Sequence, residues 1–286
     1  MKKGLFSFLV LTLAIVSLSG CGGGGWQPVL ESRAETLTLL VGFNDSTFGI
    51  SIGDDGYLFH TGDGGQSWQA AGNQSMGMYG LEIVDGEIAF ACGTGNNVRA
   101  SVDGGISWQE RANFGASFPN HCRFASFVDA QTGWIATPTL LGTTADGGAT
   151  WAEAALPDGV TSIAALSLFA PGEGTLLDVS GALYLTNDNA ATWSAAGQLP
   201  LGEIPLEVKS YPLAAMRFQD AGNGMVVVAA IVDGTGLVTA FHTVDGGATW
   251  TQETVPAPYG ALYLSRDARY LTVLTPPTAV TVWEYR

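Results

Sequence analysis

The sequence predicts an all-β protein folded as a closed β-propeller of six four-stranded blades, with seven blades as the alternative. Three observations support this prediction. Charged residues make up 13% of the 286 residues, whereas 39 Gly and 12 Pro supply many turn formers, a composition that favours short strands. An eight-residue unit recurs five times at intervals of 40, 43, 42 and 57 residues, close to the length of one propeller blade. Apolar strand-like runs precede each unit.

Residues 1–20 are predicted to be a signal peptide. Two lysines are followed by an apolar stretch from Leu5 to about Leu18, which is too short for a comfortable membrane span. The run from Leu18 to Cys21 resembles the lipobox of bacterial lipoproteins, so Cys21 is expected to carry lipid; the alternative is an ordinary signal peptide with an incidental cysteine. Residues 21–25 would then be the lipidated Cys and a flexible glycine tether.

A lipid anchor predicts a place in the bacterial cell envelope. This is the outer membrane or the periplasmic face in a Gram-negative cell, and the outer cell surface otherwise. The formal net charge of −15 excludes a nucleic-acid partner, because an acidic surface repels phosphate backbones. It also leaves the lipid as the only expected membrane contact. A monomer is expected.

The recurring unit has the chemistry of a hairpin between the third and fourth strands of a blade. Its Asp can accept hydrogen bonds from its own turn, its glycine can adopt a positive φ, and the Trp five residues after the Asp restarts a strand. These residues are therefore predicted to be structural. The five pairs are Asp63 and Trp68, Asp103 and Trp108, Asp146 and Trp151, Asp188 and Trp193, and Asp245 and Trp250.

The sequence contains six apolar strand–turn–strand segments but only five hairpin units. The last segment, which contains Tyr270–Leu274 and Val280–Tyr285, lacks an outer strand. We expect Trp26–Ser32 to supply it by pairing with Val280–Tyr285, which closes the ring and removes the open sheet edges. The propeller would then span residues 26–286.

The interval of 57 residues predicts an insertion between Trp193 and Ala214. Apolar residues on a connecting segment are typical of an interaction site, so this insertion is the candidate binding loop. The alternative is that it packs onto its own blade. Its candidate binding residues are Leu199, Leu201, Ile204 and Leu206.

Cys92 and Cys122 are expected to form a disulfide, because an exported chain reaches an oxidising compartment. Cys92 lies near the end of the second strand of blade 2 and Cys122 near the start of blade 3, so the bridge would join two blades. The alternative is a pair of buried free thiols.

The unit S/T-x-D-x-G-x-S/T-W resembles the Asp-box, or BNR, repeat of sialidases, sortilin-like receptors, some endoglucanases and the photosystem II stability/assembly-factor-like family. The fuller repeat from Phe127 to Ile135, leading into Thr144–Trp151, is most similar to that last family. The resemblance covers residues 26–286. It implies seven blades and an Arg-rich patch that binds a photosystem subunit, whereas this chain predicts six blades and has eight arginines scattered along it. The box Thr186–Trp193 has Ala190 in place of a glycine, which predicts a looser hairpin.

No catalytic residue, metal site or cofactor is predicted. The sequence contains no G-x-S-x-G, H-E-x-x-H or P-loop motif. His60 and His242 occupy equivalent repeat positions, so a shared metal would need ligands one or more blades apart. The predicted function is a non-catalytic scaffold that binds a protein partner or an envelope polymer such as a glycan. The alternative is a sialidase-like glycoside hydrolase, which needs two carboxylates facing one cleft.

Overall fold

The computed structural model describes residues 25–34, 38–53, 56–73, 77–114, 121–206, 212–276 and 278–286. The predicted signal peptide and Cys21 lie outside these residues and stay predictions. Within the described ranges, no helix has the length and apolar character required to cross a membrane.

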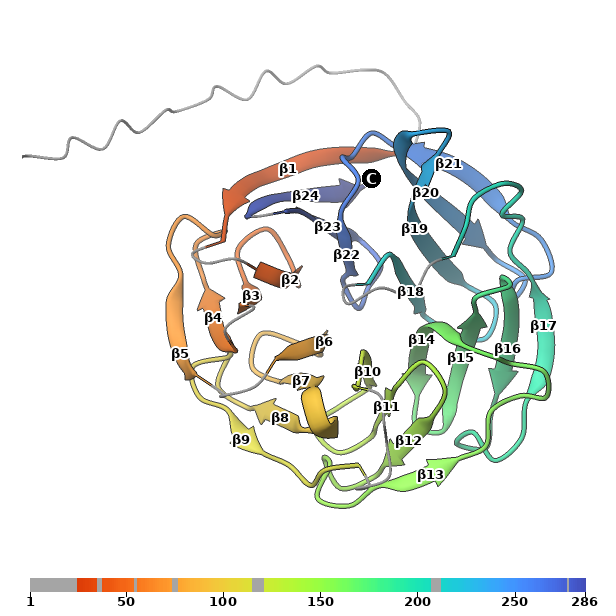
Figure 1. The fold of residues 1–286 in the computed structure, drawn as a ribbon, viewed down its shortest axis with the longest axis horizontal. Coiled ribbons are helices and arrows are strands. Elements are labelled where there is room, and N and C mark those ends of the chain that lie inside the picture. The colour runs from red at the N-terminus through yellow and green to blue at the C-terminus, as the bar shows by residue number, and fades with distance from the viewer. Residues whose placement is uncertain are drawn as a thin grey trace, which may run out of the picture.

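Six antiparallel four-stranded sheets are arranged as the blades of a ring (Figure 1). Blade 1 contains β2 (Thr38–Phe43), β3 (Gly49–Gly53), β4 (Tyr57–Thr61) and β5 (Gln69–Asn73). Blade 2 contains β6 (Met78–Ile83), β7 (Ala89–Gly93), the 3₁₀ turn η1 (Thr94–Asn96), β8 (Val98–Ser101) and β9 (Gln109–Glu110). Blade 3 contains β10 (Phe124–Phe127), β11 (Gly133–Ala136), β12 (Leu141–Thr144) and β13 (Ala152–Ala154).

The second half of the ring continues this order. Blade 4 contains β14 (Ile163–Ala170), β15 (Glu173–Asp178), β16 (Ala182–Thr186) and β17 (Ser194–Gln198). Blade 5 contains β18 (Ala214–Phe218), β19 (Gly224–Val232), β20 (Thr235–Thr243) and β21 (Thr251–Val255). Blade 6 contains β22 (Ala261–Leu264), β23 (Tyr270–Thr275), β24 (Ala279–Tyr285) and β1 (Trp26–Arg33). The six-bladed prediction is confirmed, and the seven-bladed alternative is wrong for the described part of the chain.

The ring closes by pairing the two ends of the described chain. Strand β1 is the outer strand of blade 6 and runs antiparallel to β24, with Trp26 opposite Tyr285 and Arg33 opposite Ala279. Gly25 and Arg286 extend the pairing with two backbone hydrogen bonds of 2.9 and 3.2 Å. The predicted closure is confirmed, and it leaves β24 with a partner on each side.

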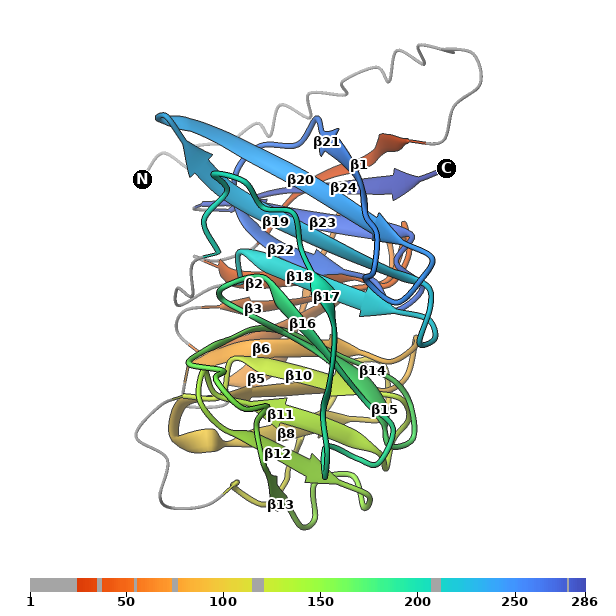
Figure 2. The ribbon, with the colours of Figure 1, turned by 90° about the vertical axis from the view of Figure 1, so that its right-hand side faces the viewer.

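The ring has two distinct faces. The first and third strands of each blade run in the same direction, so the turns that follow them meet on one side, which we call the Asp-box face. In blade 1, Gly64 N in the Asp-box turn donates a 2.8 Å hydrogen bond to Thr47 O in the first turn. The opposite side, the connector face, carries the segments that join one blade to the next (Figure 2).

Each Asp-box is a compact hydrogen-bonded turn, as the box of blade 1 illustrates. Asp63 Oδ1 accepts from Thr61 Oγ1 and from Ser67 N at 2.8 and 2.9 Å, and Asp63 Oδ2 accepts from Ser67 Oγ at 2.6 Å. The other four boxes repeat these three bonds. Trp68 Nε1 donates to Arg33 O of the preceding blade at 3.1 Å. Each box therefore fixes its own hairpin, and the boxes of blades 1, 3 and 4 also bond to the preceding segment of the ring through their Trp.

The box of blade 4 keeps this geometry without its glycines. Asn189 and Ala190 adopt positive φ angles of 58° and 63°, a left-handed conformation that strains a residue with a side chain. The backbone nitrogen of Ala190 still donates to Thr186 Oγ1 at 3.1 Å. The predicted looser hairpin is wrong, because the full set of bonds holds the strained turn.

Because of its Asp-boxes, the folded protein is expected to lose stability in acid. Hydrogen bonds from the following Ser or Thr, the side-chain bond first, lower the pKa of Asp63, Asp146 and Asp188 from 3.8 to about 2. A lowered pKa in the folded state contributes stability above about pH 4 and loses it as the pH falls toward about 2. Calorimetric melting temperatures should therefore drop across this window.

The matched control is Asp146→Asn, which removes one of these carboxylates. Its melting temperature should lie below that of the unchanged protein at pH 7, and the difference should shrink toward pH 2. An equal difference at both pH values would contradict the assignment.

Cys92 and Cys122 are joined in a disulfide, with an S–S distance of 2.12 Å and a Cα–Cα distance of 5.6 Å. Cys92 lies on β7 of blade 2, and Cys122 precedes β10 of blade 3. Both side chains are buried. The bridge therefore links two neighbouring blades.

For this pair we predict one reducible bridge. Intact mass should rise by the mass of two hydrogen atoms on reduction, and reduction should lower the free energy of unfolding by roughly 2–4 kcal/mol. The Cys92→Ala/Cys122→Ala variant is the control, because its stability should not respond to reductant. Alkylation of both thiols in the native, unreduced protein would refute the bridge.

The candidate binding loop is not an exposed apolar patch. Leu199 is buried, and Leu201, Ile204 and Leu206 are partly buried. All four belong to, or pack against, a core cluster that joins blades 4 and 5 and includes Phe241. The expectation of a solvent-facing patch is corrected for the loop up to Leu206, because these side chains cover the junction between two blades.

The insertion also explains only part of the interval of 57 residues. Strands β19 and β20 of blade 5 are nine residues long each, against six and five residues for β15 and β16 in blade 4. The hairpin β19–β20 therefore holds the rest of the extra length.

Candidate functional site: the central channel

The six inner strands surround a central channel, and each places one residue at an equivalent position. This position immediately precedes an apolar residue of the inner strand that is itself buried, such as Phe43 in blade 1 or Phe218 in blade 5. All six residues at this position are buried. We call them the hub residues; in blade order they are Gly42, Glu82, Ser126, Ser167, Arg217 and Tyr263.

An ion pair crosses the channel between opposite blades. Arg217 Nη2 of blade 5 lies 2.7 Å from Glu82 Oε2 of blade 2, and the Arg217 and Glu82 side chains are 9% and 1% exposed. Arg217 Nε donates to Leu264 O at 3.0 Å. Burial raises the pKa of Glu82, and the charges of Arg217 and Arg266 limit that rise. Burial alone would lower the pKa of Arg217, but its interactions with Glu82 and Tyr263 together raise it, so the guanidinium stays charged.

Other hub residues connect blades along the ring. Tyr263 of blade 6 reaches over blade 1, and its hydroxyl accepts from Ile83 N of blade 2 at 3.0 Å. This path requires Gly42, because a Cβ there would lie 2.9 Å from the Tyr263 ring. Ser126 Oγ accepts from Leu168 N at 2.9 Å, linking blades 3 and 4. Ser167 Oγ makes the matching 2.8 Å bond with the backbone of blade 5.

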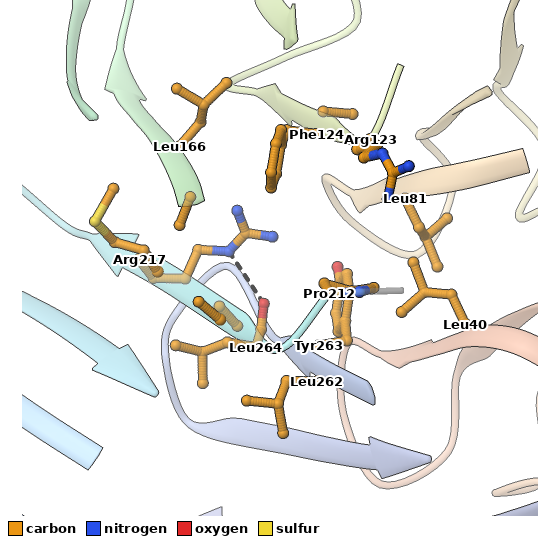
Figure 3. A pocket seen from close by; sticks show the side chains of 15 residues that line it. Leu40, Leu81, Arg123, Phe124, Leu166, Pro212, Arg217, Leu262, Tyr263 and Leu264 are labelled. Atoms are coloured by element: carbon orange, nitrogen blue, oxygen red, sulfur yellow. Dashed lines mark hydrogen bonds between the residues drawn. The ribbon is translucent and has the colours of Figure 1, made fainter. Parts of the chain in front are cut away.

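At the connector face the channel opens into a small apolar cavity of about 60 Å³. Figure 3 shows the Arg217 guanidinium inside this opening, with its bond to the carbonyl of Leu264. Leucines from several blades and Arg123 line the walls. This opening is much smaller than the cavity at the opposite face.

At the Asp-box face the channel opens into a larger, polar cavity of about 380 Å³. Glu82, Ser167 and Arg217 line it from the hub. Its remaining lining residues come from the ends of the inner strands and the turns that follow; they are Asn44, Val84, Leu168, Phe169, Phe218, Gln219, Arg266 and Asp267. Amide, guanidinium and carboxylate groups thus stand beside aromatic and aliphatic walls. We take this cavity as the candidate site.

Arg266 braces the mouth of the cavity. Its Nη1 donates to Phe127 O, so that it reaches from blade 6 to the opposite blade 3. Two arginines therefore span the channel along different diameters, Arg217 between blades 5 and 2 and Arg266 between blades 6 and 3. Three of the eight arginines that are scattered along the sequence line the channel openings: Arg123 and Arg217 at the connector face, and Arg217 and Arg266 at the Asp-box face.

Both carboxylates of the cavity accept hydrogen bonds from neighbouring groups. Glu82 is held by Arg217, and Asp267 Oδ1 accepts from Ser265 Oγ and Arg269 N at 2.5 and 3.0 Å. Within the described ranges, no group of three or more His, Cys, Asp or Glu residues lies close enough to hold a metal ion. His242 Nε2 contacts Glu253 Oε1 at 2.8 Å in its own blade.

Together, the fold and the channel define a class: an Asp-box β-propeller with an ion pair across its hub and a polar cavity at one face. Comparison with known proteins gives the particular family. The chain belongs to the family of the photosynthesis system II assembly factor Ycf48, whose family model matches residues 73–210. It is 30% identical, over 272 residues, to the photosystem II assembly lipoprotein Ycf48 of Synechococcus sp. (strain CC9902), which covers 90% of this chain and 76% of the relative.

Two solved structures are similar in fold. Ycf48 bound to a D1 peptide matches with a TM-score of 0.57 at 16% identity, covering 92% of this chain and 98% of that one. Ycf48 from Cyanidioschyzon merolae matches with a TM-score of 0.56 at 15% identity, covering 91% of this chain and 98% of the other.

Proposed function

We propose that this chain is a membrane-tethered assembly factor that binds a peptide segment of a membrane protein in the polar cavity at the Asp-box face. The observation that carries the proposal is the cavity itself, with its convergent polar groups above a floor of paired hub residues. The D1 peptide bound by a relative supports a peptide as the ligand and makes a segment of D1 the first candidate.

The lining of the cavity suits a peptide backbone. The side-chain amides of Asn44 and Gln219 can both donate and accept hydrogen bonds, as backbone N–H and C=O groups require. Arg266 adds charge-assisted donors for a carbonyl or carboxylate. Phe169 and Val84 provide an apolar wall, so polar groups fix the orientation of a ligand and apolar groups provide area.

The membrane tether rests on Cys21. The lipobox-like end of the signal segment supports it, as does the description of the cyanobacterial relative as a lipoprotein. Cys21→Ser should release the protein from the membrane fraction or leave it unprocessed. An unchanged mature mass and unchanged membrane association in this variant would remove the anchor from the proposal.

Peptide binding is tested with the soluble domain, residues 25–286, and synthetic peptides that tile the extramembrane segments of D1. We expect saturable binding by calorimetry, weakened about tenfold in Arg266→Gln, because a charge-assisted hydrogen bond is lost. Arg269→Gln is the matched control, since Arg269 belongs to the same turn but pairs with Glu284 outside the cavity. Equal affinity in Arg266→Gln and the unchanged domain would contradict the site.

The same preparation addresses the glycoside-hydrolase alternative. Turnover of sialosides or envelope glycans by the soluble domain, lost in Asp267→Asn, would replace the peptide-binding proposal with an enzyme.

A further inference from the structure

The attachment point of the tether lies on the Asp-box face. Strand β24 ends on this face and β1 begins beside it, because Trp26 pairs with Tyr285. Figure 2 shows the start of β1 and the end of β24 on the side of the ring where β18 also ends. A chain anchored at Cys21 therefore approaches the propeller from the Asp-box side.

The tether is too short to let the propeller turn freely. Five residue steps separate Cys21 from Trp26, and a fully extended chain covers at most ~17 Å over that distance. The end of blade 6 that lies on the Asp-box face must therefore stay close to the lipid headgroups.

Exposed apolar side chains occur on this face at both ends of one diameter. Val102 and Ile106 lie in the box of blade 2 and are 54% and 61% exposed, and Val244 in the box of blade 5 is 79% exposed. Blades 2 and 5 are opposite each other, as the Arg217–Glu82 pair requires. A flat surface could thus touch the ring on both sides of the channel.

The negative charge on the Asp-box face restricts the kind of lipid surface that this face can contact. The box aspartates stay ionised to low pH, because the hydrogen bonds from the following Ser or Thr lower the pKa of Asp63, Asp146 and Asp188 to about 2. Ionised carboxylates repel an anionic lipid surface and not an electroneutral one.

We propose that the tethered propeller rests with its Asp-box face on an electroneutral lipid surface, so that the polar cavity opens toward the bilayer. This inference rests on the lipid anchor of the proposed function. It narrows the bound peptide to one that lies next to the membrane, such as a segment adjoining a transmembrane span of the partner.

The test uses the mature lipidated chain in phosphatidylcholine vesicles that carry a headgroup quencher. Fluorescent labels are placed singly at Val244→Cys, Val102→Cys and Asp233→Cys. Val244 and Asp233 lie beyond opposite ends of β20, about 30 Å apart along the strand. We expect strong quenching at positions 244 and 102 and almost none at 233. Adding anionic lipid should reduce quenching at position 102, and salt should restore it.

Three results would overturn the inference. Quenching at 244 alone would mean that the propeller stands on its rim. Quenching mainly at 233 would place the connector face on the membrane. If the mature chain does not associate with vesicles, the lipid anchor on which the inference rests is refuted. Peptide binding by the soluble domain is measured without a membrane, so a failure here is separable from a failure of the proposed function.

Discussion

Replacing Arg217 with Met is expected to lower the free energy of unfolding by about 3–5 kcal/mol, because Glu82 is left as a buried charge without a partner. Arg217 lies 2.7 Å from Glu82 and also holds the carbonyl of Leu264. Denaturant titration of the single variant measures this loss.

The double variant Arg217→Met/Glu82→Leu separates the charge effect from packing. It removes both charges and should recover most of the stability lost in Arg217→Met, because no unpaired ion remains in the hub. Equal stability of the single and double variants would show that packing, and not the ion pair, makes Arg217 important.

Deleting β1, residues 26–33, is expected to destabilise the propeller by several kcal/mol and to cause self-association. The deletion uncovers the edge of β24, an unpaired strand that can pair with another chain. It also removes the indole of Trp26, which is 5% exposed, and loss of a buried Trp alone costs about 3–5 kcal/mol.

The control for this deletion is a chain that begins at Gly25 and keeps β1. It should melt at the temperature of the mature protein, since its strand pairing is intact. Thermal melting and light scattering distinguish the two chains. A β1-deleted protein that stays monomeric with an unaltered melting temperature would show that the ring closes without this strand.

The local parts of this fold were predictable from sequence. The Asp of each box bonds only within its own turn, and the box recurs once per blade, so the repeat alone indicated the hairpins and the blade length. The count of inner strands against hairpins then required an outer strand from Trp26. The hairpins were predictable because five of the six blades form from consecutive strands, and the closure followed from the count although β1 and β24 are far apart in sequence.

The channel was not predictable in the same way. Glu82 and Arg217 are 135 residues apart, and neither belongs to a recognisable motif. They meet because equivalent inner-strand positions converge on the axis once the ring closes. Comparing that one position across the six blades would have shown a Glu, an Arg and a Tyr facing a common space. The loop at Leu199 was expected to be an exposed patch for a related reason. Only the packed ring shows that its apolar side chains cover the junction between blades 4 and 5.

The Tyr263 ring packs where Gly42 has no side chain, and this has a consequence for designing propellers from this chain. A ring built from six copies of any single blade would place six identical side chains on the axis. Six arginines would repel one another, six serines would be too small to meet across the channel, and six tyrosines would collide where Gly42 now leaves room. A designed propeller with identical blades must therefore still vary the hub residue from blade to blade. The six hub residues have to be chosen together, so that they pack and pair with one another across the channel.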